Sequence, residues 1–275
     1  MRTRRGLLVI QILVSLLSAL TTPALAAAGG AFYVSLGTSL SVGIQPTPSG
    51  ENHPTPDGYA DQLFEALRTT TPGLKLHKLG CPGETSITMV SGGLCAYEQG
   101  SQLAQAVAFI QAHPGKIALI TIDVGANDVE PCASLSGTAQ AYCIGQALGD
   151  IGSNLPYVLF VLTSVAPDVP IIGMNYYNPF VVVSSASTTL QILLNDFTLA
   201  PVYGAFGVPV ADVATAFDSY NSTPDPVTGN PTNVQRICDW TWMCVPPPQG
   251  PNIHANAEGY GEIAQAFVVV WNSLP

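Results

Sequence analysis

Charged residues are scarce in this sequence, and basic residues are the scarcest of them. Of its 275 residues, 9% are charged and 47% are hydrophobic, with 8 lysines and arginines against 18 aspartates and glutamates. So large an apolar share can bury a sizeable core, which excludes an intrinsically disordered chain. The net charge of −10 makes nucleic acids and anionic membranes poor partners, because both repel an acidic surface.

Metal-binding motifs are also lacking. No two cysteines have Cys-x-x-Cys spacing, and none lies near a histidine in zinc-finger order, so neither a metal site nor another cofactor is expected. The six cysteines instead suit disulfides in a secreted chain. Sequential pairing is the simplest of several arrangements, and it joins three close pairs: Cys81–Cys95, Cys132–Cys143 and Cys238–Cys244.

The first residues have the pattern of a secretory signal peptide. Three arginines near the start are followed by an apolar run and then by a small-residue cleavage site at residues 23–26. A membrane anchor is the alternative, but a spanning helix needs about 20 apolar residues and this run is shorter. We therefore expect a signal peptide over residues 1–26, one secreted domain over residues 27–275, and no stable membrane anchor after cleavage.

Strand-like and helix-like segments alternate along the rest of the chain. Such alternation predicts a parallel sheet with helices on both faces. The expected fold is a three-layer α/β/α sandwich with a central, mostly parallel five-stranded sheet. Two proline-rich stretches, 44–56 and 221–252, are expected to be irregular. The predicted strands are 31–37, 74–79, 117–124, 170–176 and 208–211, and the predicted helices are 55–71, 98–112, 138–165 with a break at Pro156, 186–206 with a bend at Pro201, and 256–271.

Polar segments follow the first three of these strands. Ser39 comes after the first strand, where an apolar run gives way to Gly37-Thr38-Ser39. Gly83 follows the second strand, and Asn127 follows the third in Gly125-Ala126-Asn127-Asp128. Functional groups of parallel sheets gather beyond the carboxyl ends of the strands, so these segments should converge at one edge.

These residue types suit acyl transfer, which needs a nucleophile, a base and donors for the oxyanion. Ser39 can supply the nucleophile, although Gly-x-Ser after an apolar run also occurs by chance. Of the four histidines, His254 is the candidate base, because it stands before the last helix, which returns to the same edge. The backbone N–H groups of Ser39 and Gly83 and the amide of Asn127 are candidate donors; a role in a tight turn is the alternative for the last two.

Four short blocks together resemble the SGNH-hydrolase superfamily, the GDSL-type esterases and lipases, in its secreted bacterial form. Gly37-Thr38-Ser39-Leu40-Ser41 is similar to its serine block and Pro82-Gly83-Glu84-Thr85 to its glycine block. Residues 125–128 are similar to its asparagine block and residues 253–260 to its histidine block. Each block is weak alone, but the four stand in family order and span nearly the whole chain after the signal peptide.

The resemblance implies a flavodoxin-like SGNH fold and ester hydrolysis through an acyl-enzyme. Ser39 would attack the ester carbonyl, His254 would act as base, and Ser39, Gly83 and Asn127 would form the oxyanion hole. The expected protein is a secreted monomer that acts on a lipid or small-molecule ester without a cofactor. Two alternatives stay open: a catalytically degenerate binding protein with the same fold, and an esterase of the polysaccharide deacetylase type.

Two positions depart from the family pattern. The family usually has aspartate directly before the serine, where this chain has Thr38, and another three residues before the histidine, where it has Pro251. His254 could then be oriented by a backbone carbonyl, most simply that of Pro251, or by a distant acid such as Asp239. In the third alternative the protein is inactive.

A cluster of large apolar residues precedes the histidine block. Trp240, Trp242 and Met243 lie in or beside the segment that a Cys238–Cys244 disulfide would close. We expect them to form an apolar lip over the acyl site; the alternative is that they only cover a helix face.

Overall fold

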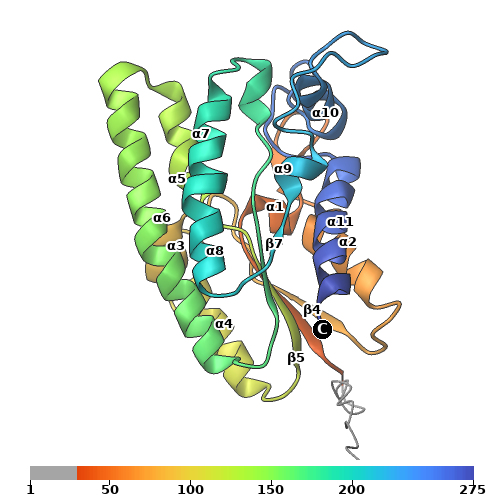
Figure 1. The fold of residues 1–275 in the computed structure, drawn as a ribbon. Coiled ribbons are helices and arrows are strands. Elements are labelled where there is room, and N and C mark those ends of the chain that lie inside the picture. Colours follow the sequence, from red (N-terminus) through yellow and green to blue (C-terminus); the bar gives the residue numbers. More distant parts are fainter. Residues whose placement is uncertain (1–29) are drawn as a thin grey trace, which may run out of the picture.

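The described part of the molecule is built around one parallel sheet of five strands. The structure is a computed structural model that describes residues 30–275, so the predicted signal peptide, residues 1–26, lies outside it. The strands stand in the order β4-β1-β5-β6-β7, and every neighbouring pair is parallel. Figure 1 shows the sheet between its helices. This confirms the predicted α/β fold. The strands are β1 Phe32–Leu36, β4 Lys75–Lys78, β5 Ile117–Ile122, β6 Ile171–Met174 and β7 Val210–Ala211.

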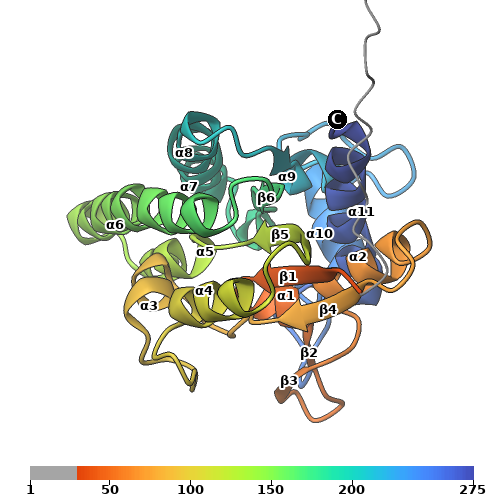
Figure 2. The same ribbon diagram turned by 90° about the horizontal axis from the view of Figure 1, so that it is seen from below.

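Helices cover both faces of the sheet (Figure 2). One layer holds α2 and α11 with α10 beside them, and the other holds α3 to α8. The helices are α1 Ser39–Val42, α2 Tyr59–Leu67, α3 Ser86–Ser91, α4 Gln102–Ala112, α5 Ala126–Val129, α6 Gly137–Val165, α7 Ser187–Leu194, α8 Ala200–Ala205, α9 Val213–Ala216, α10 Thr232–Trp240 and α11 Ala257–Ser273, with shorter turns η1 Glu130–Ser134, η2 Pro179–Val182 and η3 Asn195–Leu199.

The strands lie at the centre because their side chains are apolar on both faces of the sheet. β5 reads Ile-Ala-Leu-Ile-Thr-Ile, and its Leu119, Ile120 and Ile122 are fully buried. In contrast, α2 buries one stripe at helical spacing, which includes Tyr59 and Leu63, and exposes its opposite side. The hydrophobic pattern thus separates the central layer from the two outer ones.

The long helix α6 differs from its prediction. It runs unbroken from Gly137 to Val165, so the predicted break at Pro156 is wrong. A proline removes one hydrogen bond from a helix interior, but Leu155 and Val158 on either side are buried in the core and hold the helix together. By length and composition alone, α6 could cross a membrane. In the structure, however, one side of α6 packs against α3, α4 and α5.

Three further segments are arranged differently from the prediction. The 186–206 region is interrupted by the π-helical turn η3, whereas Pro201 sits in the first turn of α8, where proline is tolerated. The first proline-rich stretch contains an antiparallel hairpin of β2, Ile44–Pro46, and β3, Asn52–Pro54, and the second contains α10. Helix α3 was not predicted either.

All three disulfides join the predicted cysteines. Cys81 pairs with Cys95, Cys132 with Cys143 and Cys238 with Cys244, which confirms sequential pairing. The second of these ties η1 to α6. Closing short loops of this kind stabilises a fold by about 2–3 kcal/mol each, chiefly by constraining the unfolded chain.

Charge is unevenly distributed over this fold. No lysine or arginine occurs between Lys116 and Arg236, and residues 131–211 carry only three charged side chains, all of them aspartates. The two exposed lysines, Lys75 and Lys116, stand at the amino ends of β4 and β5. The elements from η1 to β7 therefore form a nearly uncharged third of the described residues.

Candidate active site

The turn after β1 places Ser39 at the start of a short helix. Thr38 caps α1, and its Oγ1 accepts a hydrogen bond from the N–H of Leu40 at 3.4 Å. Ser39 is the first residue of α1, so its own N–H has no acceptor within the helix and is free to bind a ligand atom. Gly37 must lack a side chain, because a Cβ there would overlap Oδ1 of Asp123. Ser39 itself is only 8% exposed.

A buried glutamine holds the backbone of the same turn. The Gly37 N–H donates to Gln102 Oε1 at 2.6 Å, and Gln102 Nε2 donates back to the Gly37 carbonyl at 3.0 Å. Gln102 Nε2 also contacts Glu84 Oε2 at 2.8 Å, in the glycine block. Burial raises the pKa of the Glu84 carboxyl. These contacts join the serine and glycine blocks through α4.

The asparagine block begins α5 and is tied to the glycine block. Asn127 Nδ2 donates to the Glu84 carbonyl at 2.9 Å, which leaves its second amide hydrogen available. Asp128 accepts hydrogen bonds from Ser86 N–H at 2.9 Å and Ser86 Oγ at 2.6 Å. Burial raises the pKa of Asp128 to about 6. Gly83, next to Glu84, has a φ of 81°, a left-handed conformation that favours glycine.

The loop before α11 carries His254, and its ring is oriented by Asn252. The Oδ1 atom of Asn252 lies 2.7 Å from His254 Nδ1 and accepts the backbone N–H of His254 at 3.0 Å. A backbone N–H can only donate, so the Asn252 atom that it contacts must be the oxygen. His254 Nδ1 must then carry a proton to make its own contact. This leaves Nε2 unprotonated, as a general base requires.

Burial also keeps the imidazole of His254 neutral. It lowers the pKa of His254 to about 4, because the charged ring is poorly solvated where it lies. Asn252 accepts a hydrogen bond but brings no negative charge to offset this effect. His254 is therefore neutral at neutral pH, and its protonated form is weakly stabilised.

Neither orienting group named from the sequence contacts the ring of His254. Asp239 Oδ1 accepts a hydrogen bond from Gln235 Nε2 at 2.7 Å, and no hydrogen bond joins Pro251 to the imidazole in the described residues. The family pattern does not point to Asn252, because the family places its acid one residue earlier. The signal that could have found it is an amide side chain in the segment directly before the histidine.

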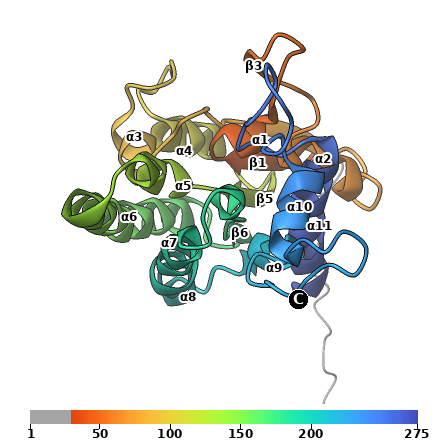
Figure 3. The same cartoon turned by 90° about the horizontal axis from the view of Figure 1, so that it is seen from above.

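The β2–β3 hairpin supports Asn252 from outside. Asn252 Nδ2 donates to Asn52 Oδ1 on β3 at 2.7 Å, and Figure 3 shows the hairpin beside the loop that leads to α11. The indole N–H of Trp242 in that loop donates to Gln45 Oε1 on β2 at 3.3 Å. The hairpin thus contacts the histidine loop at two points.

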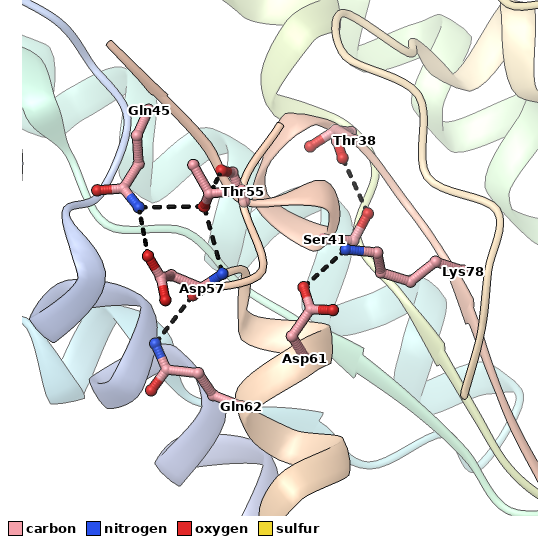
Figure 4. A network of polar contacts seen from close by, with 9 residues as sticks. Thr38, Ser41, Gln45, Thr55, Asp57, Asp61, Gln62 and Lys78 are labelled. Atoms are coloured by element: carbon pink, nitrogen blue, oxygen red, sulfur yellow. Dashed lines mark hydrogen bonds and ion pairs between the residues drawn. The ribbon is translucent and has the colours of Figure 1, made fainter. Parts of the chain in front are cut away.

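A polar network anchors the hairpin to α2 (Figure 4). Gln45 Nε2 donates to Thr55 Oγ1 at 3.1 Å and to Asp57 Oδ2 at 3.2 Å. Gln62 Nε2 donates to the carbonyl of Asp57 at 2.9 Å and to that of Ala257, at the start of α11, at 2.8 Å. Hairpin, α2 and α11 are therefore joined around the base of the histidine loop.

Ser39, Asn127 and His254 open onto one cavity of about 470 Å³. Its remaining wall is largely apolar and comes from α5, η1, α6, the segment 176–184 that contains η2, and α7. The residues of this wall include Val129, Ile144, Tyr177, Phe180, Leu190 and Leu194. Carboxylates are almost absent from the lining, with Glu130 as the exception. The shape and chemistry suit an alkyl chain beside a polar reacting group.

The three residues predicted to form a lip do not line this cavity. Trp240 packs edge-on against Phe217, with ring centroids 5.1 Å apart, and Arg236 lies over its indole. Trp242 faces the hairpin through Gln45. The structure thus gives Trp240 the covering role that was the alternative, and it assigns the apolar wall to α6 and α7.

Comparison with known proteins gives a consistent result. The GDSL-like Lipase/Acylhydrolase family model matches residues 35–261. The chain is similar to an extracellular lipase from Streptomyces rimosus, with 19% identity, a TM-score of 0.57, and 90% of this chain and 100% of that one covered. It is similar to phospholipase A1 from Streptomyces albidoflavus NA297, with 17% identity, a TM-score of 0.53, and coverage of 89% and 99%.

An acetylxylan esterase from Geobacillus stearothermophilus, Axe2, is a further structural neighbour, with 15% identity, a TM-score of 0.56, and coverage of 87% and 94%. A comparison with curated proteins found no match. At these identities the neighbours show a shared fold, while the family model spans most of the chain and all four sequence blocks. The chain belongs to the GDSL-like lipase/acylhydrolase family of esterases and lipases.

Proposed function

We propose that the protein is a secreted carboxylic-ester hydrolase that forms an acyl-enzyme on Ser39. The observation that carries the proposal is that Ser39, Asn127 and His254, which come from distant parts of the chain, line the same cavity. A degenerate binding protein would not need an unprotonated Nε2 on the histidine. In the present protein, the hydrogen bond between His254 Nδ1 and Asn252 leaves Nε2 unprotonated. Secretion is supported by the three disulfides, which form in oxidising compartments.

The proposed reaction uses Ser39, Asn127 and His254 from the cavity lining, and it takes Gly83 from the sequence motif, since Gly83 is not among the lining residues. Ser39 Oγ attacks the ester carbonyl while His254 Nε2 takes its proton, and the carbonyl oxygen becomes an oxyanion. The N–H groups of Ser39 and Gly83 and the free amide hydrogen of Asn127 donate to this oxyanion. His254 then gives its proton to the leaving alcohol. A water molecule, activated by the same base, hydrolyses the acyl-enzyme and restores Ser39.

Asn252 completes a Ser-His-Asn arrangement in this mechanism. It fixes the tautomer of His254 through a hydrogen bond of 2.7 Å, as an aspartate would, but it does not stabilise the imidazolium by charge. We therefore expect slower turnover than with a carboxylate. Because the pKa of His254 is lowered to about 4, the base stays unprotonated in mildly acidic solution and activity should persist there.

The substrate is an ester with an alkyl acyl chain. Leu190, Leu194 and Ile144 give the cavity an apolar wall, and a bound acyl chain would remove this surface from water. Most of the exposed lining surface is apolar, which suits an acyl chain better than the hydroxyl groups of an acetylated polysaccharide, so we favour a lipid ester over the deacetylase alternative.

Fluorophosphonate labelling with peptide mapping tests the proposal. We expect one adduct, on Ser39, with hydrolysis of p-nitrophenyl esters that is lost in both Ser39→Ala and His254→Ala. Folding of the variants is checked by thermal denaturation. An unlabelled wild-type protein with no esterase activity would instead favour the binding-protein alternative.

A further inference from the structure

Asp123 is a buried carboxylate beside the nucleophile turn, and the four family blocks do not include it. It follows β5 directly and is fully buried. Its Oδ2 accepts two hydrogen bonds from Thr38, from the N–H at 3.0 Å and from Oγ1 at 2.6 Å. Its Oδ1 accepts a third from the hydroxyl of Tyr59 on α2, at 2.6 Å. One side chain thus joins β5, the serine turn and α2.

No cation offsets this carboxylate in the described residues, whose three ion pairs all lie elsewhere. Burial raises the pKa of Asp123 to about 7, while the hydrogen bonds from Thr38 and Tyr59 oppose that shift. Around it lie tyrosines that carry no charge at neutral pH: Tyr33, Tyr59, Tyr176, Tyr203 and Tyr260. A buried, unpaired acid costs stability, so a role in the site would explain its presence.

The contacts of Asp123 determine where the peptide before Ser39 lies. Thr38 Oγ1 donates to Asp123 and accepts from the Leu40 N–H, so the hydroxyl links the carboxylate to the first turn of α1. Oδ1 of Asp123 occupies the space where a side chain on Gly37 would lie. The carboxylate therefore fits against the residues on both sides of the Gly37–Thr38 peptide and leaves little freedom for Ser39.

We propose that Asp123 is a positioning residue for Ser39 and supplies from β5 the carboxylate that the family usually carries directly before the serine. In this chain that preceding residue is Thr38, a short hydroxyl donor that suits an acid approaching from the next strand. The inference rests on the proposed function, because it concerns how Ser39 is held for attack.

The test compares variants that disturb the hydrogen bonds between Asp123 and Thr38 with a variant that leaves them intact. Asp123→Asn keeps the shape of the side chain but offers one acceptor in place of two. Thr38→Val keeps the shape of Thr38 and removes its hydroxyl. Tyr59→Phe is the matched control, because it removes a hydrogen bond to the same carboxylate without touching the serine turn. The readouts are the rate of fluorophosphonate labelling at Ser39, kcat and KM on one p-nitrophenyl ester, and thermal stability.

We expect Asp123→Asn and Thr38→Val to slow labelling and lower kcat by about ten- to a hundred-fold, with KM changed little, because the nucleophile is misplaced while the cavity is intact. Tyr59→Phe should lose thermal stability yet label within about three-fold of the wild type. If Asp123→Asn does not fold, Thr38→Val decides the question.

Three results would overturn the inference. Labelling of Asp123→Asn or Thr38→Val at the wild-type rate would mean that the carboxylate does not position Ser39, and the proposed function would stand. Equal slowing in all three variants would mean that Asp123 acts only through stability. A wild-type protein that is not labelled would overturn the proposed function and this inference together.

Discussion

The two sides of the candidate site differ in chemistry. On the serine side, buried polar groups such as Gln102 and Asp123 make several hydrogen bonds each, and the glycine between them has no room for a side chain. On the cavity side, α6, η2 and α7 present mostly carbon, and residues 131–149 and 169–195 contain no charged side chain. Under the proposed function, the serine side would position the reacting atoms and the cavity side would select the acyl chain.

The largest effect is expected from removing a donor on the serine side. Asn127→Ala takes away the amide that we assign to the oxyanion hole, which should lower kcat about a hundred- to a thousand-fold with a smaller change in KM. Steady-state kinetics on a p-nitrophenyl ester measure this. Because Asn127 also donates to the Glu84 carbonyl, Asn154→Ala serves as a nearby control: its contact with Ser86 Oγ is long, 3.5 Å, and its loss should matter little. A change in KM alone would contradict the assignment.

The cavity side is tested by filling it. Ile144→Trp places a large side chain in the apolar wall and should lower kcat/KM on long acyl esters by at least about ten-fold, with a small effect on acetate. Tyr142→Trp is the matched control on the same helix, because Tyr142 is 70% exposed and does not line the cavity. An acyl-chain-length series measures both variants. Equal losses on acetate and on long chains would argue against an acyl-binding wall.

A moderate gain is expected from adding a negative charge beside His254. Asn252→Asp puts a carboxylate beside His254 Nδ1, which favours the imidazolium and raises the pKa of His254 from about 4. We expect kcat to rise by about ten-fold at pH 8 and the acid limb of kcat/KM to move upward by about one to two pH units.

Asn252→Ala should show the opposite change at pH 8, because the ring then loses its orienting acceptor. Asn52→Ala, which removes the partner of Asn252 on β3, should cause a smaller loss. An unchanged pH profile in Asn252→Asp would mean that this side chain does not orient the base.

The smallest effect concerns stability and pH. The folded-state pKa of Asp123, about 7, lies above its value of 3.8 in the unfolded chain. The folded state therefore holds this proton more tightly, and the stability it contributes is present below pH 3.8 and is lost as pH rises through 7. Between pH 5 and pH 8 the wild type should lose about 2–3 kcal/mol more stability than Asp123→Asn, as measured by urea denaturation. Parallel curves would contradict this.

Much of the fold follows from the sequence, but the site follows only in part. The continuous apolar run of β5 and the stripe of α2 identify central and outer layers directly. The many prolines of residues 221–252 made an irregular segment the natural prediction there. None of them lies inside α10, so they do not prevent this helix. The role of Asp123 is hard to predict for another reason: in the sequence it is a single polar residue within an apolar run.

The apolar wall of the cavity could not be located from local pattern, because it depends on how α6 and α7 approach each other. The tryptophans near His254 are close to it in sequence, yet Trp240 faces Phe217 and Trp242 faces Gln45. Sequence proximity to a catalytic residue does not determine which way a side chain points. The sequence does identify His254, because a histidine directly before the last helix is expected to lie at the carboxyl edge of the sheet.

The positions of the exposed lysines determine which end of the molecule would face a solid support after coupling through amines. Lys75 and Lys116 are exposed at the amino ends of β4 and β5, whereas Lys78 is paired with Asp61 at 2.7 Å. Ser39, Asn127 and His254 lie at the opposite, carboxyl edge of the sheet. Amine-reactive beads that couple through these lysines would hold the molecule by the end remote from the cavity, so the immobilised protein should keep its opening toward the substrate solution.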